Sequence, residues 1–240
     1  MENGIDSPSG ASQLKVSEIF YSIQGEGPSI GVPCVFLRLA VCNLQCSWCD
    51  TKYSWDWQHY DYEKEVTEIS PDQVAKLILE YDCRHLVVTG GEPMLQQDEL
   101  APMLERLKEK GFTIEVETNG TILPNWGMEQ VIDQWNVSPK LDNSGNSAAA
   151  REIPECYRYF SGTPGAYFKY VVENREDLDE ILGLVRKYGI SRERVMLMPE
   201  STSPELLREK SAWLAEICKS EGFRFTTRLH IILYGNRRGS

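Results

Sequence analysis

The sequence has little positive charge and no long apolar run, and both shortages narrow the range of partners. Its 240 residues include 25 Lys and Arg against 36 Asp and Glu, a formal net charge of −11. Binding along nucleic acid needs clustered Lys and Arg to replace counterions on phosphates, so we expect no direct nucleic-acid partner. No apolar stretch approaches the roughly 20 residues that cross a bilayer, and the N-terminal residues lack the parts of a signal peptide. These features predict a cytoplasmic protein with a small-molecule partner and no membrane contact.

Histidine is also scarce, whereas cysteine is not. The three histidines, His59, His85 and His230, have no spacing typical of a catalytic triad or a metal site. Seven cysteines is an odd number, and a reducing compartment disfavours disulfides, so we expect metal-binding or catalytic use. Four of them are isolated in apolar or helical patterns and are expected to fill the core: Cys34, Cys83, Cys156 and Cys218.

Short apolar runs alternate with helical patterns along residues 14–240, which we interpret as a single domain after a mobile tail at residues 1–13. Helical spacing is clearest around Val74 to Tyr81, Leu100 to Leu107 and Leu178 to Val185. The predicted strands are residues 34–40, 85–89, 113–117, 135–138, 167–172 and 195–198. Strands that alternate with helices predict an α/β fold with a parallel sheet, either doubly wound or a partial barrel.

The distinctive polar stretches all follow predicted strands. "CNLQCSWCDT" follows the first, "GGEP" the second, "TNGT" the third and "SPK" the fourth. Because ligands gather at the carboxyl ends of parallel strands, we expect these stretches to share one rim.

Cys42, Cys46 and Cys49 form a C-x3-C-x2-C pattern with no fourth cysteine nearby. A structural zinc site usually takes four ligands, commonly as two separated pairs. Three thiolates on a tight loop instead suit a 4Fe–4S cluster whose fourth iron stays open for a ligand. A non-catalytic zinc module remains the competing interpretation, and anaerobic reconstitution separates the two because zinc is colourless.

The triplet, with Trp48 before its last cysteine, resembles the signature of the radical S-adenosylmethionine (SAM) superfamily, and "TGGEP" (89–93) is similar to that superfamily's SAM-binding motif. The resemblance implies that SAM binds the open iron and is cleaved after one-electron reduction, generating a radical that abstracts a substrate hydrogen. Gly90 and Gly91 would let the backbone approach SAM, and Glu92 would offer its ammonium a counter-charge. Further expected SAM contacts are Glu117, Asn119, Ser138, Pro139, Lys140, Met198, Pro199 and Glu200.

Residues 20–57 resemble the 7-carboxy-7-deazaguanine synthase family, and the likeness continues through "VVTGGEPMLQ", "EVETNGT" and "VSPK" to "LHIILYGNRRG". The resemblance implies an incomplete (β/α)6-type barrel, a homodimer and a flavodoxin-like or other electron donor. It implies a lyase of queuosine and 7-deazapurine biosynthesis that converts 6-carboxy-5,6,7,8-tetrahydropterin to 7-carboxy-7-deazaguanine, releasing ammonia, with SAM regenerated and Mg²⁺ assisting.

The same resemblance assigns the pterin site and the Mg²⁺ ligand. Thr51 would bind Mg²⁺, while the neighbouring Asp50 would orient its loop. An amide and a carboxylate suit the edge of an aminopyrimidinone, and an arginine can clamp a carboxylate in two-pronged fashion. The expected pterin contacts are Ile23, Gln24, Gly25, Glu26, Arg38 and Thr89.

A glycyl-radical-enzyme activase would share the cluster and SAM motif but act on a protein, and turnover of the carboxytetrahydropterin would distinguish it. Residues 141–162 receive no role beyond connecting strands or lining a dimer contact, and contacts made by the C-terminal residues are unassigned.

Overall fold

The computed structural model describes residues 12–239, which form one nine-stranded sheet in the order β3-β1-β2-β4-β5-β6-β7-β8-β9. All neighbours from β2 to β9 run parallel, whereas β1 pairs antiparallel with both β2 and β3. The expected mobile tail at residues 1–13 lies almost wholly outside the described residues. The strands are β1 (Leu14–Ile23), β2 (Pro33–Leu39), β3 (Thr67–Ile69), β4 (His85–Gly90), β5 (Thr113–Thr118), β6 (Gln134–Val137), β7 (Ala166–Val172), β8 (Val195–Pro199) and β9 (Arg224–Phe225).

The six strands predicted from apolar runs are β2 and β4 to β8, and each lies within about one residue of its predicted bounds. They are adjacent and in chain order, so they form the expected parallel, partial-barrel wall. Three further strands were not predicted. β1 mixes polar and apolar residues and is mostly half-buried, while β3 and β9 are only three and two residues long. Their strand state depends on their neighbours in the sheet rather than on a local pattern.

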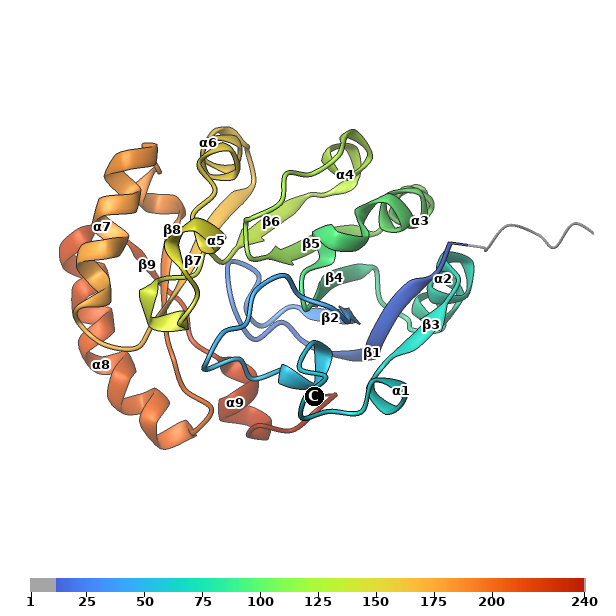
Figure 1. The fold of residues 1–240 in the computed structure, drawn as a ribbon, viewed down its shortest axis with the longest axis horizontal. Helices are drawn as coiled ribbons and strands as arrows, with labels where there is room; N and C mark the ends of the chain where they lie inside the picture. Colours follow the sequence, from blue (N-terminus) through green and yellow to red (C-terminus); the bar gives the residue numbers. More distant parts are fainter. Residues whose placement is uncertain (1–11, 240) are drawn as a thin grey trace, which may run out of the picture.

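Helices cover the outer face of the curved sheet (Figure 1). Ser70 begins α2 as expected, because its hydroxyl accepts a hydrogen bond from the Gln73 amide in a capping box. Gly189 ends α7 in the left-handed region at φ 63°, as a helix-ending glycine does. The main helices are α2 (Pro71–Leu79), α3 (Gln97–Glu109), α4 (Trp126–Val131), α6 (Pro154–Gly162), α7 (Asp177–Tyr188) and α8 (Pro204–Glu221). The short ones are α1 (Tyr62–Glu65), α5 (Ala148–Arg151) and α9 (Leu229–Tyr234), with 3-10 turns η1 (Lys52–Ser54), η2 (Pro93–Gln96), η3 (Asp142–Ser144) and η4 (Arg192–Arg194).

The two faces of the parallel strands differ in chemistry. Side chains alternate along a strand, so Ile114 and Val116 of β5 enter the main core while Glu115 and Glu117 point to the opposite face. Burying one such aliphatic side chain contributes roughly 1.5–3 kcal/mol. The same alternation places Lys169 of β7 opposite the core residues Phe168 and Tyr170. The outer face therefore stabilises the sheet, and the inner face is free to carry polar groups.

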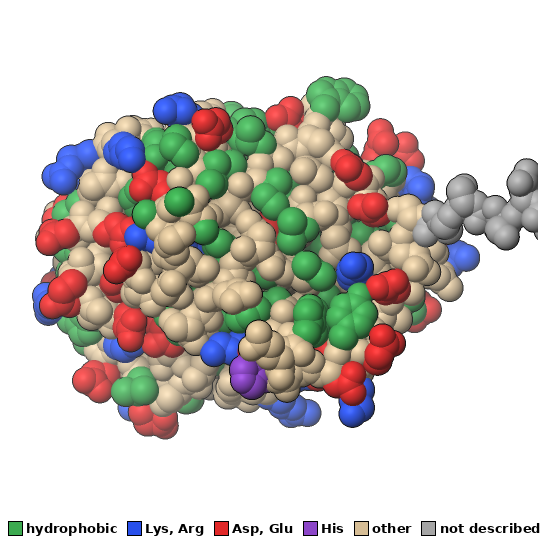
Figure 2. All heavy atoms as spheres, viewed as in Figure 1, with side chains coloured by type: hydrophobic (Ala, Val, Ile, Leu, Met, Phe, Trp, Pro, Cys, Tyr) green, Lys and Arg blue, Asp and Glu red, His purple; other side chains and the backbone are tan. Residues whose placement is uncertain are grey.

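The surface is mixed in character. Figure 2 shows charges of both signs interspersed around the rim of this face, with hydrophobic side chains scattered between them. Within residues 12–239, no helix is both long enough and apolar enough to span a bilayer.

Candidate active site

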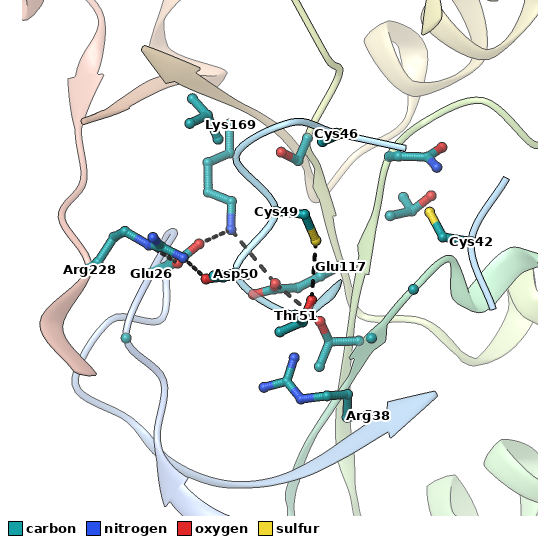
Figure 3. A pocket seen from close by; sticks show the side chains of 18 of the residues that line it. Glu26, Arg38, Cys42, Cys46, Cys49, Asp50, Thr51, Glu117, Lys169 and Arg228 are labelled. Atoms are coloured by element: carbon teal, nitrogen blue, oxygen red, sulfur yellow. Dashed lines mark hydrogen bonds and ion pairs between the residues drawn. The ribbon is translucent and has the colours of Figure 1, made fainter. Parts of the chain in front are cut away.

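A pocket of about 1190 Å³, counting the part open to solvent, lies on the inner face of the sheet at the carboxyl ends of the strands. Three other segments complete its wall: the turn after β1, residues 42–51 (the cysteine loop), and the segment that enters α9. Figure 3 shows side chains from these segments converging on a common space. The polar stretches that follow the strands thus share one rim, as the sequence predicts.

Most of the expected site residues line this pocket. They comprise all four metal-ligand candidates, all six pterin-contact candidates and seven of the SAM-contact candidates: Cys42, Cys46, Cys49 and Thr51; Ile23, Gln24, Gly25, Glu26, Arg38 and Thr89; and Gly90, Gly91, Glu117, Asn119, Ser138, Lys140 and Met198. Glu92, Pro139, Pro199 and Glu200 do not line it.

Glu92 lies behind the pocket lining, because it is fully buried and its carboxylate is bonded within the protein. One oxygen accepts from the Met94 amide (3.1 Å) and the Thr118 hydroxyl (2.8 Å), and the other from the Asn119 amide (2.6 Å). Burial raises the pKa of Glu92 against the opposing effect of these bonds. The carboxylate joins the segments after β4 and β5, and its role as a counter-charge for the ammonium of SAM stays a prediction.

The other three departures have simpler causes. Glu200 is turned toward α8, where its carboxylate pairs with Lys210 at 3.0 Å. Pro139 and Pro199 are buried at the ends of β6 and β8. Of the residues expected after the last long strand, only Met198 reaches the pocket.

The glycine pair of "TGGEP" is required by close backbone packing. A Cβ on Gly90 would lie 2.1 Å from the Leu39 carbonyl oxygen, and one on Gly91 would lie 2.0 Å from that of Val41. These approaches allow the Gly91 amide to donate to Leu39 (2.9 Å) and the Glu92 amide to donate to Val41 (2.8 Å). The pair therefore fixes the GGE turn directly against the start of the cysteine loop.

Val41, immediately before Cys42, has a strained backbone. Its φ is 74°, a left-handed value that a β-branched residue rarely adopts. Its amide donates to the Ser54 carbonyl (2.7 Å), and its own carbonyl accepts from Glu92. Two segments thus hold Val41 in place, and such strain typically costs about 1–3 kcal/mol.

The cysteine loop is also held by residues 143–146, which is more than the connecting role expected for residues 141–162. The Ser47 amide donates to the Ser144 carbonyl (3.0 Å), and the Gln45 amide donates to Asn146 Oδ1 (3.0 Å). Trp48 Nε1 donates to Asn143 Oδ1 at 3.2 Å. The loop is therefore fixed from the β6 side as well as from β2 and β4.

The donor set of the loop fits an iron–sulfur cluster. Three thiols line one pocket, while Cys34, Cys156 and Cys218 are buried elsewhere and Cys83 is half-buried. Across residues 12–239, no three His, Cys, Asp or Glu side chains converge as ligands of a single metal ion. A 4Fe–4S cluster makes a different demand, because each thiolate binds its own iron. Burial raises the pKa of the Cys42 thiol to about 12, so ligation would release a proton from it.

Four charged residues also line the pocket, and we call them the charged wall: Glu26, Glu117, Lys169 and Arg228. Lys169 and Arg228 are buried, and Glu26 and Glu117 are half-buried. Lys169 Nζ pairs with Glu26 and lies 3.7 Å from Glu117 Oε2. Arg228 Nε lies 3.1 Å from Glu26 Oε1, and its Nη1 donates to the Ser201 carbonyl at 2.8 Å. Figure 3 shows the Glu26 carboxylate between the two cations.

The charges of this wall are mutually stabilised. Burial alone would raise the pKa of Glu26, but Lys169, Arg228 and His230 together bring it well below its usual value. Burial would lower the pKa of Lys169, but Glu117 and Glu26 raise it. Both groups therefore remain ionised at neutral pH.

Arg228 also connects the charged wall to the cysteine loop. Its second terminal nitrogen pairs with Asp50, which stands between Cys49 and Thr51. Asp50, which we expect to orient the loop, therefore has Arg228 as its partner. Since Arg228 has acceptors on three chain segments, its planar fork suits this position better than a lysine ammonium would.

Two polar residues complete the wall toward β4. Gln24 Nε2 donates to Glu117 Oε1 (3.2 Å), and the Thr89 hydroxyl donates to Glu117 Oε2 (3.4 Å). Arg38 lies beside them, with Nε held 2.9 Å from Glu18 Oε2 and its guanidinium over the Phe20 ring.

Sequence reasoning missed Lys169, Arg228 and His230 as pocket residues. Lys169 could have been found from the sequence, because a lysine inside the apolar run "YFKYVV" is expected to be buried only if it has a charged partner. His230 packs closely on Gly25, with Nδ1 2.2 Å from where a Cβ on Gly25 would lie. His230 lies in the first turn of α9, and its place in the pocket follows from tertiary structure.

Comparison with known proteins agrees with this geometry. The sequence model of the Radical SAM superfamily matches residues 38–135. The 7-carboxy-7-deazaguanine synthase of Pyrobaculum aerophilum is 42% identical over 235 residues, covering 96% of this chain and 99% of that protein. That of Hyperthermus butylicus is 34% identical and covers 92% of both. The crystal structure of QueE from Escherichia coli matches with a TM-score of 0.68 and 26% identity, covering 91% of this chain and 95% of the other. The chain therefore belongs to the 7-carboxy-7-deazaguanine synthase family.

Proposed function

We propose that this protein is a 7-carboxy-7-deazaguanine synthase, a radical SAM lyase that contracts 6-carboxy-5,6,7,8-tetrahydropterin to 7-carboxy-7-deazaguanine and releases ammonia. The observation that carries the proposal is the composition of one pocket. Three thiols of the cysteine loop line it, together with a largely buried set of carboxylates, cations and an amide. The family membership of the chain supports the same reaction.

Cys42, Cys46 and Cys49 would hold the 4Fe–4S cluster, and the GGE turn with Ser138, Lys140, Asn119 and Met198 would border SAM. When bound, this pair supplies the one-electron cleavage that removes a hydrogen from the substrate. The chain supplies position. Ser138 Oγ accepts from Lys140 Nζ at 3.0 Å, which aims a cation toward the rim where the carboxylate of SAM would lie. Glu92 would act indirectly, because its carboxylate accepts a hydrogen bond from the Asn119 backbone amide and so fixes the position of Asn119.

The pterin would lie against the charged wall. Gln24 offers a donor and an acceptor on one side chain, and the Glu26 and Glu117 carboxylates accept hydrogen bonds from ring N–H and amino groups. Arg38, already oriented by Glu18, would face the substrate carboxylate. Because Lys169 and Arg228 balance the carboxylates before substrate arrives, the wall is arranged in advance, and little reorganisation accompanies binding.

Thr51 would contribute a hydroxyl to Mg²⁺, with substrate oxygens and water completing the shell. Its Oγ1 lies 3.6 Å from Cys49 Sγ, at the end of the cysteine loop nearest to Arg38 in Figure 3. Thr51→Ala should raise the Mg²⁺ concentration for half-maximal turnover at least tenfold, whereas Thr51→Ser should retain the wild-type value. An unchanged Mg²⁺ response in Thr51→Ala would remove this residue from the metal site.

The deciding experiment for the reaction is an anaerobic assay of reconstituted protein with dithionite, SAM, Mg²⁺ and the carboxytetrahydropterin, analysed by mass spectrometry. We expect 7-carboxy-7-deazaguanine and ammonia in equal amounts, with SAM not consumed. Cleavage of SAM without a deazaguanine would contradict the function. The same assay tests the glycyl-radical-activase alternative, which the comparisons do not favour.

The family also suggests two partners: a second copy of the chain and a one-electron donor, flavodoxin-like or another. Light scattering of the purified protein tests the homodimer, and a monomer at assay concentration would contradict it. Replacing dithionite by reduced flavodoxin tests the donor, with product formation expected.

A further inference from the structure

Each of the three cysteine sulfurs in the cysteine loop accepts one N–H hydrogen bond from the protein. Cys42 Sγ accepts from the Leu44 amide at 3.5 Å. Cys46 Sγ accepts from Asn146 Nδ2 at 3.4 Å, and Cys49 Sγ accepts from Trp55 Nε1 at 3.3 Å. The first donor is local backbone, whereas the other two are side chains brought in from outside the loop.

The identity of both side-chain donors is fixed. An indole nitrogen only donates, so the Trp55 contact has one direction. The Asn146 amide is oriented by the Gln45 backbone N–H, which donates to Oδ1 at 3.0 Å and leaves Nδ2 facing Cys46. Its Nδ2 also contacts Ser144 Oγ at 3.2 Å. Asn146 lies 100 residues from Cys46 in the chain, so this contact does not follow from the cysteine motif itself.

These donors bear on electron uptake. Reduction of a 4Fe–4S cluster adds one electron from an external one-electron donor, and the cluster with its thiolates becomes more negative by one charge. An N–H dipole directed at a ligand sulfur stabilises that added charge, so it raises the reduction potential.

We propose that Asn146 and Trp55 set the reduction potential of the cluster, each through one N–H···S hydrogen bond to a ligating cysteine. The inference deepens the proposed function and rests on its cluster, but it requires neither SAM nor the pterin. It gives Asn146 a redox role in addition to holding the loop.

The test is a potentiometric titration of the reconstituted protein, followed by electron paramagnetic resonance without SAM or substrate. Trp55→Phe keeps the aromatic bulk and removes the donor, and Asn146→Leu removes the other donor at similar size. Trp57→Phe is the matched control, because Trp57 lies two residues away, does not line the pocket and packs edge-on against Tyr62. At the potential that half-reduces the wild-type, each donor variant should show a roughly tenfold lower ratio of reduced to oxidised cluster. That ratio corresponds to a downward shift of about 59 mV for one electron.

The result predicted is wild-type iron content in all four variants, lower potentials in Trp55→Phe and Asn146→Leu, a larger shift in the double variant, and no shift in Trp57→Phe. A wild-type potential in both iron-loaded donor variants would overturn the proposal, as would an equal shift in Trp57→Phe. The proposal would also be overturned if both donor variants lost iron while Trp57→Phe kept it, because the two groups would then only hold the loop. Wild-type protein that binds no cluster would instead refute the proposed function.

Discussion

The cysteine loop and the charged wall both line one pocket but are built in opposite ways. The loop places three thiols and the Thr51 hydroxyl within ten consecutive residues. The charged wall draws its members from the turn after β1, from β5 and β7, and from the segment before α9, with Glu26 separated from Lys169 by 143 residues and from Arg228 by 202. One region is specified by local spacing and the other by the complete fold.

This difference predicts different responses to substitution. Replacing a thiol or hydroxyl residue of the loop should remove a cofactor while the fold remains, because these side chains would mainly bind an external group. Replacing a residue of the charged wall should affect both stability and substrate, because each charge there is the partner of another. Removing one partner of a buried ion pair typically costs about 3–5 kcal/mol.

The largest expected effect is on the loop. Cys49→Ala should abolish iron binding and turnover, because two thiolates do not satisfy a cluster that needs three. The unfolding free energy of the metal-free protein should change by less than about 1 kcal/mol, since Cys49 is only half-buried. Absorbance after anaerobic reconstitution and urea unfolding measure the two quantities.

Cys218→Ala is the matched control, because it removes a buried thiol that lies on α8 outside the pocket. It should bind iron normally and lose about 1 kcal/mol of stability from the vacated space. If Cys49→Ala retained the colour of wild-type, or Cys218→Ala lost it, the loop would not be the cluster site.

A smaller effect should appear in the acid response of the charged wall. Burial lowers the pKa of His230 from 6.5 to about 4; Glu26 opposes this shift, and Arg228, Lys169 and Arg38 reinforce it. Below about pH 6.5 the unfolded chain therefore binds a proton at His230. The folded protein binds that proton only below about pH 4. The contribution of His230 to the free energy of unfolding is complete above pH 6.5. It falls with decreasing pH, by about 2 kcal/mol between pH 7 and pH 5.

Urea unfolding of the metal-free protein at pH 7 and pH 5 measures this loss. His230→Gln should remove that part of the slope, while the contribution of Glu26 appears only below its usual pKa of 4.5, because its folded pKa is lowered. An equal slope in wild-type and His230→Gln would show that His230 does not resist protonation.

The smallest effect concerns the backbone joint between β2 and the loop. Val41→Gly should stabilise the protein by about 1 kcal/mol, because relief of a strained φ exceeds the extra flexibility that glycine gives the unfolded chain. Thermal unfolding measures the change, with iron content as the control for an intact loop. A loss of stability would mean that the valine side chain contributes more than its backbone costs.

The comparison also explains what could be predicted from sequence. Continuous apolar runs identified β2 and β4 to β8, because a buried parallel strand can be recognised from its own apolar residues without reference to the strands beside it. The cysteines and the glycine pair were recognisable because their chemistry depends on local spacing. β1 was missed because its half-buried, mixed residues become a strand only beside β2 and β3.

The sequence did not indicate a residue's position wherever that position depends on tertiary partners. Glu92 is a residue type that can bind an ammonium, but the Met94 amide, the Thr118 hydroxyl and the Asn119 amide all donate to its carboxylate and hold it inside the protein. Arg228 has no local signal at all, because its partners Glu26, Asp50 and Ser201 come from three other segments. Residues 143–146 likewise became informative only when they were found against the cysteine loop.

The most direct test of the division between the two regions is anaerobic calorimetry of SAM and of the carboxytetrahydropterin binding to reconstituted wild-type and Glu26→Gln protein. Glu26→Gln removes the central charge of the wall without changing its size, so pterin affinity should fall about 100-fold, or roughly 2.7 kcal/mol. Iron content and SAM affinity should stay within about twofold of wild-type. Unchanged pterin affinity, or a parallel loss of SAM binding, would contradict the account.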